Sequence, residues 1–186
     1  MIGYAFCGSY CTFSSSFGVL RALIAAGEDV LPIFSYNAAT TDTRFGRAAS
    51  ILQEAEMLCG RPPVLTVVDA EPLGPKTPLE ALIIAPCTGN TLAKLAQGIT
   101  DTPVTMAAKA HLRQGRPLLL ALASNDAMGA NLKNVATLLE KKSVYFVPMM
   151  QDDPEKKPHS LVADFSLLPS ALAAAREGRQ LRPLFR

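Results

Sequence analysis

Short apolar runs alternate along this chain with longer segments of helical spacing. The runs that we interpret as strands cover residues 2–6, 29–34, 64–68, 81–85, 118–123 and 144–147. The segments that we interpret as helices cover residues 15–26, 43–59, 90–97, 104–114, 130–140 and 167–177. The strands are almost wholly apolar rather than alternating, which is typical of a parallel sheet covered on both faces. The pattern therefore predicts an α/β fold, a doubly wound, Rossmann-like parallel sheet with helices on both faces, in a single domain of residues 1–186.

Glycine and proline support these boundaries. Gly27 ends the first predicted helix, and Gly115 followed by Pro117 ends the fourth. Residues 179–186 form a short basic tail. This tail is either frayed or docked on a neighbouring protomer.

Composition narrows the class of protein. Of the 186 residues, 49% are hydrophobic and 18% charged, and the net charge of +2 comes from scattered residues. Such a charge distribution gives no basic patch that would bind nucleic acid or an anionic membrane. No apolar run approaches the roughly 20 residues of a membrane helix. No basic segment of a signal peptide precedes the first apolar run. The four cysteines lack CxxC spacing, so we expect reduced thiols, no metal site and a cytoplasmic protein.

Candidate chemistry lies where the predicted strands end, because open α/β sheets bind ligands beyond the carboxyl ends of their strands. Four such loops carry small polar residues, and their key members are Gly8, Ser9, Ser35, Asn37, Cys87, Thr88, Asn90, Thr91, Ser124 and Asn125. Two of the loops run into helix N-termini, where backbone N–H groups and the helix dipole favour a phosphate. The alternative is that these hydroxyls only cap helices. Four such loops at equivalent positions favour a cofactor crevice.

The same loops exclude two nucleotide-binding motifs. The loop after the first strand does not read GxGxxG, so a dinucleotide fingerprint is absent. None of the four loops contains Lys or Arg, and no GKS or GKT sequence occurs. Backbone amides and hydroxyls are suited to one phosphate monoester better than to a triphosphate with magnesium.

The segment Pro86-Cys87-Thr88-Gly89-Asn90-Thr91 resembles the PxSxNT motif of the flavoprotein family. That family includes flavin-dependent cysteine decarboxylases and flavin prenyltransferases. Within it, the chain is most similar to the family of dipicolinate synthase B subunits. The strings that carry this likeness are TRFG at 43–46, AEPLGPK at 70–76, TDTPV at 100–104, MAAKA at 106–110, SNDA at 124–127 and QDDP at 151–154, with KKP at 156–158.

This resemblance implies an oxidoreductase component that takes part in making pyridine-2,6-dicarboxylate from a dihydrodipicolinate-type precursor during sporulation. It implies FMN held by the strand-end residues named above. It also implies a partner, the dehydrogenase-like A subunit of dipicolinate synthase, which would bring NADP or NAD, and a homo-oligomer. The alternatives are a non-catalytic module that binds or scaffolds the partner, or a stand-alone FMN-dependent decarboxylase or prenyltransferase.

Departures from the relatives weaken the last alternative. The prenyltransferases carry an Arg-Glu pair after the fifth strand, where this chain has Ala123-Ser124. The decarboxylases use a histidine in the first half of the chain, whereas the only histidines here are His111 and His159. No catalytic residue is assigned; Asp126 is the one obvious candidate for a general base in the loops.

Several other residues have two interpretations each. Arg44, at the start of the second predicted helix, offers the two-donor fork that a dicarboxylate needs, or an ion pair between protomers. Cys7 and Cys11 are a redox pair or two small packing residues, and we favour packing. Cys87 contacts the flavin ring or packs in the core. We interpret Asp101 as the N-cap of the following helix rather than an acid catalyst, and His111 as a surface or packing residue.

Overall fold

The computed structural model describes all 186 residues. Its sheet places β1 (Ile2–Phe6), β2 (Val30–Phe34), β3 (Leu82–Cys87), β4 (Leu118–Ser124) and β5 (Val144–Phe146) in the order β2-β1-β3-β4-β5, all parallel. Every residue of β1 and β3 is buried, because helices cover both sides of the sheet. The predicted doubly wound fold is therefore confirmed. Its strand order reverses between β1 and β3, which is where such sheets bind ligands.

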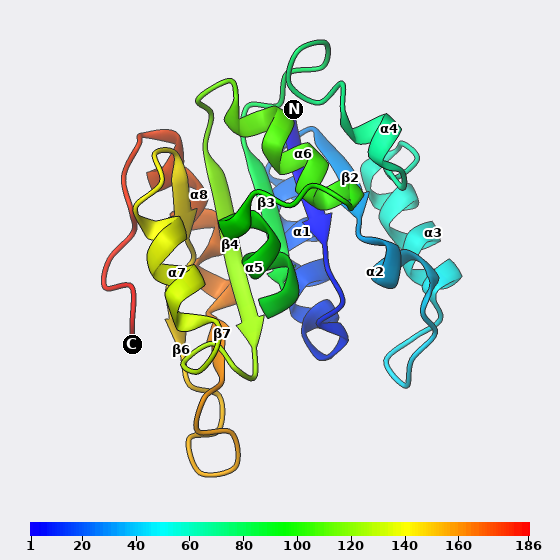
Figure 1. Cartoon of the computed structure of the whole chain (residues 1–186). Helices are drawn as coiled ribbons and strands as arrows, with labels where there is room; N and C mark the ends of the chain where they lie inside the picture. The colour runs from blue at the N-terminus through cyan, green and yellow to red at the C-terminus, as the bar shows by residue number, and fades with distance from the viewer.

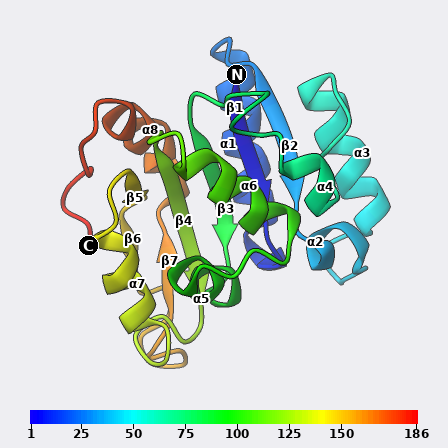
Figure 2. The same cartoon turned by 45° about the horizontal axis from the view of Figure 1, so that its top comes forward.

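Eight α-helices accompany the sheet (Figure 1). They are α1 (Phe13–Ala25), α2 (Tyr36–Thr40), α3 (Ala48–Cys59), α4 (Val67–Ala70), α5 (Gly89–Gln97), α6 (Pro103–Leu112), α7 (Leu132–Leu139) and α8 (Leu168–Arg176), with short 3-10 turns at Tyr10–Thr12 and Phe165–Leu167. Helices α1, α3 and α8 cover one face of the sheet, and α4, α5, α6 and α7 cover the other. Figure 2 shows the two layers from a second direction.

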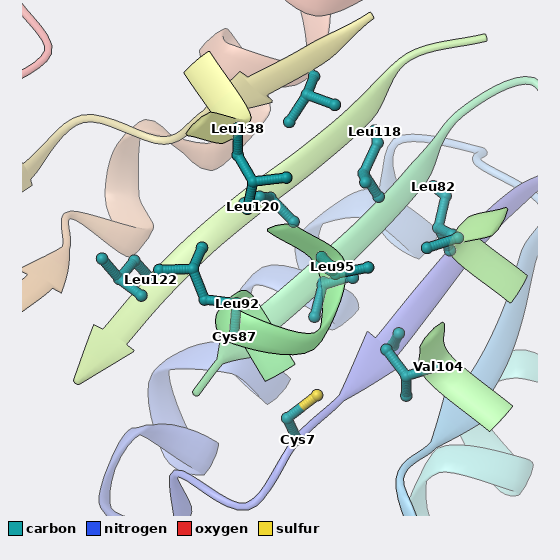
Figure 3. Close-up of a cluster of buried hydrophobic side chains, with 14 of the residues drawn as sticks. Cys7, Leu82, Cys87, Leu92, Leu95, Val104, Leu118, Leu120, Leu122 and Leu138 are labelled. Atoms are coloured by element: carbon teal, nitrogen blue, oxygen red, sulfur yellow. The ribbon is translucent and has the colours of Figure 1, made fainter. Parts of the chain in front are cut away.

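Each face has its own apolar core. On the α1 side the ring of Phe6 stacks on Phe34 and Phe17, with centroids 4.7 and 4.9 Å apart. On the α5 side, leucines of β3 and β4 pack against Leu92 and Leu95 of α5 (Figure 3). Burial of this apolar surface supplies the main favourable term in folding.

Two short strands lie beyond the parallel sheet, and the apolar pattern does not predict them. The strands β6 (Met149–Met150) and β7 (Leu161–Ala163) form an antiparallel hairpin, and β7 also pairs antiparallel with the end of β4. In Figure 1 this hairpin extends past the end of the molecule towards which β4 points. It places residues 151–160 beside the carboxyl ends of the strands.

The structure differs from the sequence predictions at three places in particular. Residues 64–68 do not form a strand: Val64 makes one isolated bridge to Ile33, and Thr66 then caps α4. The helix expected over 43–59 begins at Ala48, so the segment before it is a loop. The tail 179–186 is not frayed, because Leu184 and Arg186 hydrogen-bond to the backbone of Met149 in the same chain.

Candidate functional site

Two adjoining hollows lie at the carboxyl ends of β1, β2, β3 and β4. The larger cleft, of about 780 Å³, includes Ser9, Arg44, Ser124 and Asn125 in its lining. The smaller pocket, of about 330 Å³, includes Ser35, Asn37, Asn90 and Thr91. Gly8, after β1, and Thr88, after β3, line both. These two residues flank the point where the strand order reverses, so the hollows meet where the topology favours a ligand.

The loop after β1 is fixed by hydrogen bonds to its surroundings. The Tyr10 hydroxyl donates to the carbonyl oxygen of Asn37 at 2.8 Å, which ties this loop to α2. Ser16 is fully buried and donates to the carbonyl oxygen of Ala85 at 2.5 Å. No side chain caps the start of α1. The serines of this loop therefore do not serve as helix caps. At the ends of β2 and β3 the alternative interpretation is correct, because Ser35 caps α2 and Thr88 caps α5.

The start of α5 has a side-chain cap. Thr88 is the N-cap, and its hydroxyl accepts from the N–H of Thr91 at 3.2 Å. The Thr91 hydroxyl in turn donates to the thiol of Cys7 at 3.3 Å. Helix geometry leaves the N–H groups of Gly89 and Asn90 without a partner inside the helix. Asn90 is exposed and its side chain makes no hydrogen bond, so this amide is free for a ligand.

Gly89 leaves no room for a side chain. A Cβ built there lies 2.6 Å from Ser124 Oγ, 2.7 Å from Asn131 Nδ2 and 2.9 Å from Asp126 Oδ1. These three groups form a network in which Ser124 and Asn131 donate to the Asp126 carboxylate. The network holds the loop after β4 against the first turn of α5.

Asp126 is a poor candidate for a general base, because it lines neither hollow and is held by this network. Hydrogen bonds from Ser124 and Asn131 lower the pKa of this carboxyl below its ordinary value of 3.8. A proton acceptor works best when its pKa lies near the working pH. Asp126 therefore has a structural role in the loop.

The buried cysteines are packing residues. Cys7 and Cys87 are 1% and 0% exposed, and both belong to the apolar cluster of Figure 3. Burial raises the pKa of Cys7 to about 11 and that of Cys87 well above 9.0. Cys87 lines neither hollow. Cys11 is exposed and lines the larger cleft, so Cys7 and Cys11 lie in different environments, and all four cysteines are free thiols.

Three charged residues line the larger cleft: Arg44, Asp152 and Lys157. The sequence indicated Lys157 only as part of a basic loop at 156–159, which would meet a dicarboxylate or a partner chain, and it gave no reason to single out Asp152. Both come from the hairpin between β6 and β7, and they form an ion pair with Nζ 2.7 Å from Oδ2. Arg44 lies in the loop before α3, and its guanidinium sits 4.8 Å from the centre of the Phe45 ring. The signal in the sequence is the charged string QDDPEKKP at 151–158, which contributes to the family resemblance.

The structure also decides the roles of Asp101 and His111, which lie at the two ends of α6. Asp101 does not cap α6, because Thr102 is its N-cap and forms a capping box with Thr105. Asp101 instead pairs with Lys94 at 2.8 Å. His111 is fully buried at the other end of α6, where its Nε2 lies 2.9 Å from the carbonyl oxygen of Pro117. It is a packing residue.

Comparison with known proteins decides the family. The sequence model of the Flavoprotein family matches residues 6–165. The chain belongs to the flavoprotein family. It is 44% identical over 183 residues to the B subunit of dipicolinate synthase from Bacillus subtilis strain 168, covering 98% of this chain and 92% of that protein.

Solved structures agree with this placement. This flavoprotein superimposes on the B subunit of dipicolinate synthase from Bacillus halodurans C with a TM-score of 0.91 and 40% identity, over 100% of this chain and 95% of the other. It matches the FMN-dependent cysteine decarboxylase SpaF with a TM-score of 0.67, over 94% of this chain and 95% of that one. At 24% identity, the second likeness shows a shared fold. None of the flavoprotein's helices has the length and apolar character needed to cross a membrane.

Proposed function

We propose that this flavoprotein is the FMN-binding component of a dipicolinate synthase. It takes part in oxidising a dihydrodipicolinate-type precursor to pyridine-2,6-dicarboxylate during sporulation. The observation that carries the proposal is the 44% identity to the B subunit of dipicolinate synthase, which extends over 98% of the chain. The likeness therefore includes the strand-end loops as well as the core.

The two hollows fit the parts of FMN. A pocket of about 330 Å³ with one hydrophobic lining residue suits the phosphate and ribityl chain, and a cleft of about 780 Å³ suits the ring system. The Ser35 hydroxyl, the amides of Asn37 and Asn90, and the first-turn N–H groups of α5 are the donors for a phosphate. Thr88 and Thr91 line the same pocket and position that turn, because their hydroxyl protons are donated to Thr91 and to Cys7. Gly8, Ser9, Ser124 and Asn125 line the larger cleft and are the contacts for the ring system of FMN.

The absence of a side chain at Gly89 supports this fit. A Cβ there would enter the network of Ser124, Asn131 and Asp126, so α5 can pack this closely on the loop after β4 only because glycine stands at this position. Gly89 and Ser124 both line the cleft, so this close contact shapes its wall. Bound FMN supplies an acceptor for the two electrons that leave the dihydro precursor.

The chain's own residues bind and orient rather than move protons. Asp126 has a lowered pKa and three side-chain hydrogen bonds, and His111 is buried away from both hollows. We therefore propose that turnover needs the dehydrogenase-like partner with NADP or NAD, and that the assembly is a homo-oligomer of this chain with that partner in the cytoplasm.

A non-catalytic scaffold for the dehydrogenase-like partner is the second candidate. The observation that favours it is that no histidine lines the cleft and that its one carboxylate, Asp152, is paired with Lys157. Absorption spectra of the purified chain with added FMN distinguish the two. An FMN-binding component shifts and sharpens the flavin bands at stoichiometric ratio, whereas a scaffold leaves them unchanged.

Reconstitution tests the activity itself. The chain and the dehydrogenase-like partner are assayed separately and together, each with FMN and a nicotinamide cofactor, for formation of pyridine-2,6-dicarboxylate from the dihydro precursor. The proposal expects product in the mixture and little from this chain alone. Full turnover by the partner without this chain would contradict it, and so would efficient turnover by this chain alone with nicotinamide.

A further inference from the structure

The larger cleft brings together two cations that lie 113 positions apart in the chain, Arg44 and Lys157. Arg44 comes from the loop between α2 and α3, and Lys157 from the hairpin between β6 and β7. Figure 1 shows both segments at the end of the molecule towards which the strands point. With Asp152, these are the charged residues of the cleft lining, so two positive charges and one negative face the same space.

Lys157 is held in position by its hairpin. Its N–H donates to the carbonyl oxygen of Asp153 at 2.7 Å, and its own carbonyl oxygen accepts from Ser160 at 3.0 Å. The carbonyl oxygen of His159 accepts from the N–H of Met128, which ties the hairpin to the loop after β4. The Lys157 ammonium is fixed by the Asp152 carboxylate at 2.7 Å. A lysine with this support loses less side-chain entropy on binding a ligand than a free surface lysine.

Both cations keep donors for an anion. An ammonium has three N–H donors, and Asp152 uses one of those on Lys157. The Arg44 guanidinium forms none of the eight ion pairs of the structure, and its planar fork is directed by stacking on Phe45. An anion with two separate carboxylates is the ligand that uses both sets of donors.

We propose that Lys157 and Arg44 are the two cations of a single dicarboxylate-binding site, in which each takes one carboxylate of a ring dicarboxylate. Asp152 is the positioning residue for Lys157. The site sits in the cleft assigned to the flavin ring, so it brings the ring of the substrate beside the electron acceptor. This inference rests on the proposed function, and it adds the residues that select a dicarboxylate over a monocarboxylate.

The test compares two probes, pyridine-2,6-dicarboxylate and pyridine-2-carboxylate, by isothermal titration calorimetry on the full chain with FMN present. The wild-type chain is expected to bind the dicarboxylate tighter. Lys157→Met keeps the length of the side chain and removes its charge, and it is expected to weaken dicarboxylate binding about tenfold or more. Binding of the monocarboxylate should change less, because Arg44 still supplies its fork. Lys156→Met is the matched control, since the neighbouring lysine is exposed and lies outside the cleft lining.

The outcomes separate this inference from the proposed function. Equal dicarboxylate affinity in Lys157→Met and Lys156→Met would overturn the two-cation site, as would a wild-type chain with no preference between the probes. Activity reconstituted with the dehydrogenase-like partner, measured on the same samples, reports on the proposed function independently. Thermal melts of both variants identify any loss of fold, and none is expected because both lysines lie on the exposed hairpin.

Discussion

Asn131 donates hydrogen bonds of 2.9 Å from its side-chain amide to both carboxylate oxygens of Asp126. Ser124 donates a third to the same carboxylate at 2.5 Å. The negative charge is thus stabilised by donors, and the pKa of Asp126 falls. An aspartate in this setting joins the loop after β4 to the start of α7 and is a weak base, which leads to the first prediction.

Asp126→Asn should leave the rate of the reconstituted synthase within about threefold of wild type, because no proton is taken up by this side chain. Removal of a true general base costs roughly 10²–10⁴-fold. The variant should lose about 1 kcal/mol of stability, since one acceptor of the network is lost at an exposed residue. Steady-state kinetics and thermal melts measure the two effects. A rate loss above a hundredfold in a folded variant would restore Asp126 as the base.

Asn90→Ala should weaken FMN binding about tenfold or more and leave the melting temperature unchanged. The reason is that Thr88, and not Asn90, caps α5, so the substitution removes a ligand contact worth roughly 1.5–3 kcal/mol and no helix cap. Thr66→Ala is the converse control. It removes the N-cap of α4, outside both hollows, and should cost about 1 kcal/mol of stability without effect on FMN. Flavin titrations and thermal melts of both variants measure the two effects. A lowered melting temperature in Asn90→Ala would argue against a role for Asn90 in FMN binding alone.

Gly89→Ala should destabilise the chain by roughly 1–3 kcal/mol and impair FMN binding, because the added methyl meets Ser124, Asn131 and Asp126 at under 3.0 Å. Gly18→Ala is its counterpart inside α1. A Cβ at Gly18 meets no atom within 4 Å, so the better helix former should raise stability by up to about 1 kcal/mol. Urea denaturation of the two variants compares them directly. Equal effects of the same sign would show that the contacts at Gly89 do not matter.

His111 should make the chain less stable as the pH falls from 7.5 to 5.5. Burial lowers the pKa of His111 below its ordinary 6.5, and the nearby Arg116 adds to the effect. The unfolded chain therefore binds more protons than the folded one in this range, so the free energy of unfolding rises with pH. The stability that the neutral, buried His111 contributes is lost as the pH drops below about 6.5.

Two variants isolate this contribution. His111→Gln keeps a hydrogen-bond donor for the carbonyl oxygen of Pro117 and should flatten the dependence of the melting temperature on pH between 7.5 and 5.5. His159→Gln replaces the other histidine, which is exposed, and should leave the wild-type dependence intact. A slope that persists in His111→Gln and disappears in His159→Gln would reverse the assignment.

The sequence by itself determined the layered fold and most of the candidate site. Runs such as 2–6 and 118–123 are apolar at every position, and only strands covered on both faces bury such runs completely. The polar residues that follow the strands could then be placed together, because parallel strands end at one edge. Gly8, Ser35, Thr88 and Ser124 line the two hollows there.

Tertiary structure decided what periodicity leaves ambiguous. The run at 64–68 reads equally as a strand or a helix start, and the cap at Thr66, with Val64 making one bridge to Ile33, settled it as a helix start. The strands β6 and β7 are too short to show a period, and they form because the end of β4 offers a partner. Lys157 and Arg44 share a cleft because that hairpin folds back over the strand ends. Such distant contacts cannot be predicted from local sequence, because their favourable free energy is gained only when the whole sheet has formed.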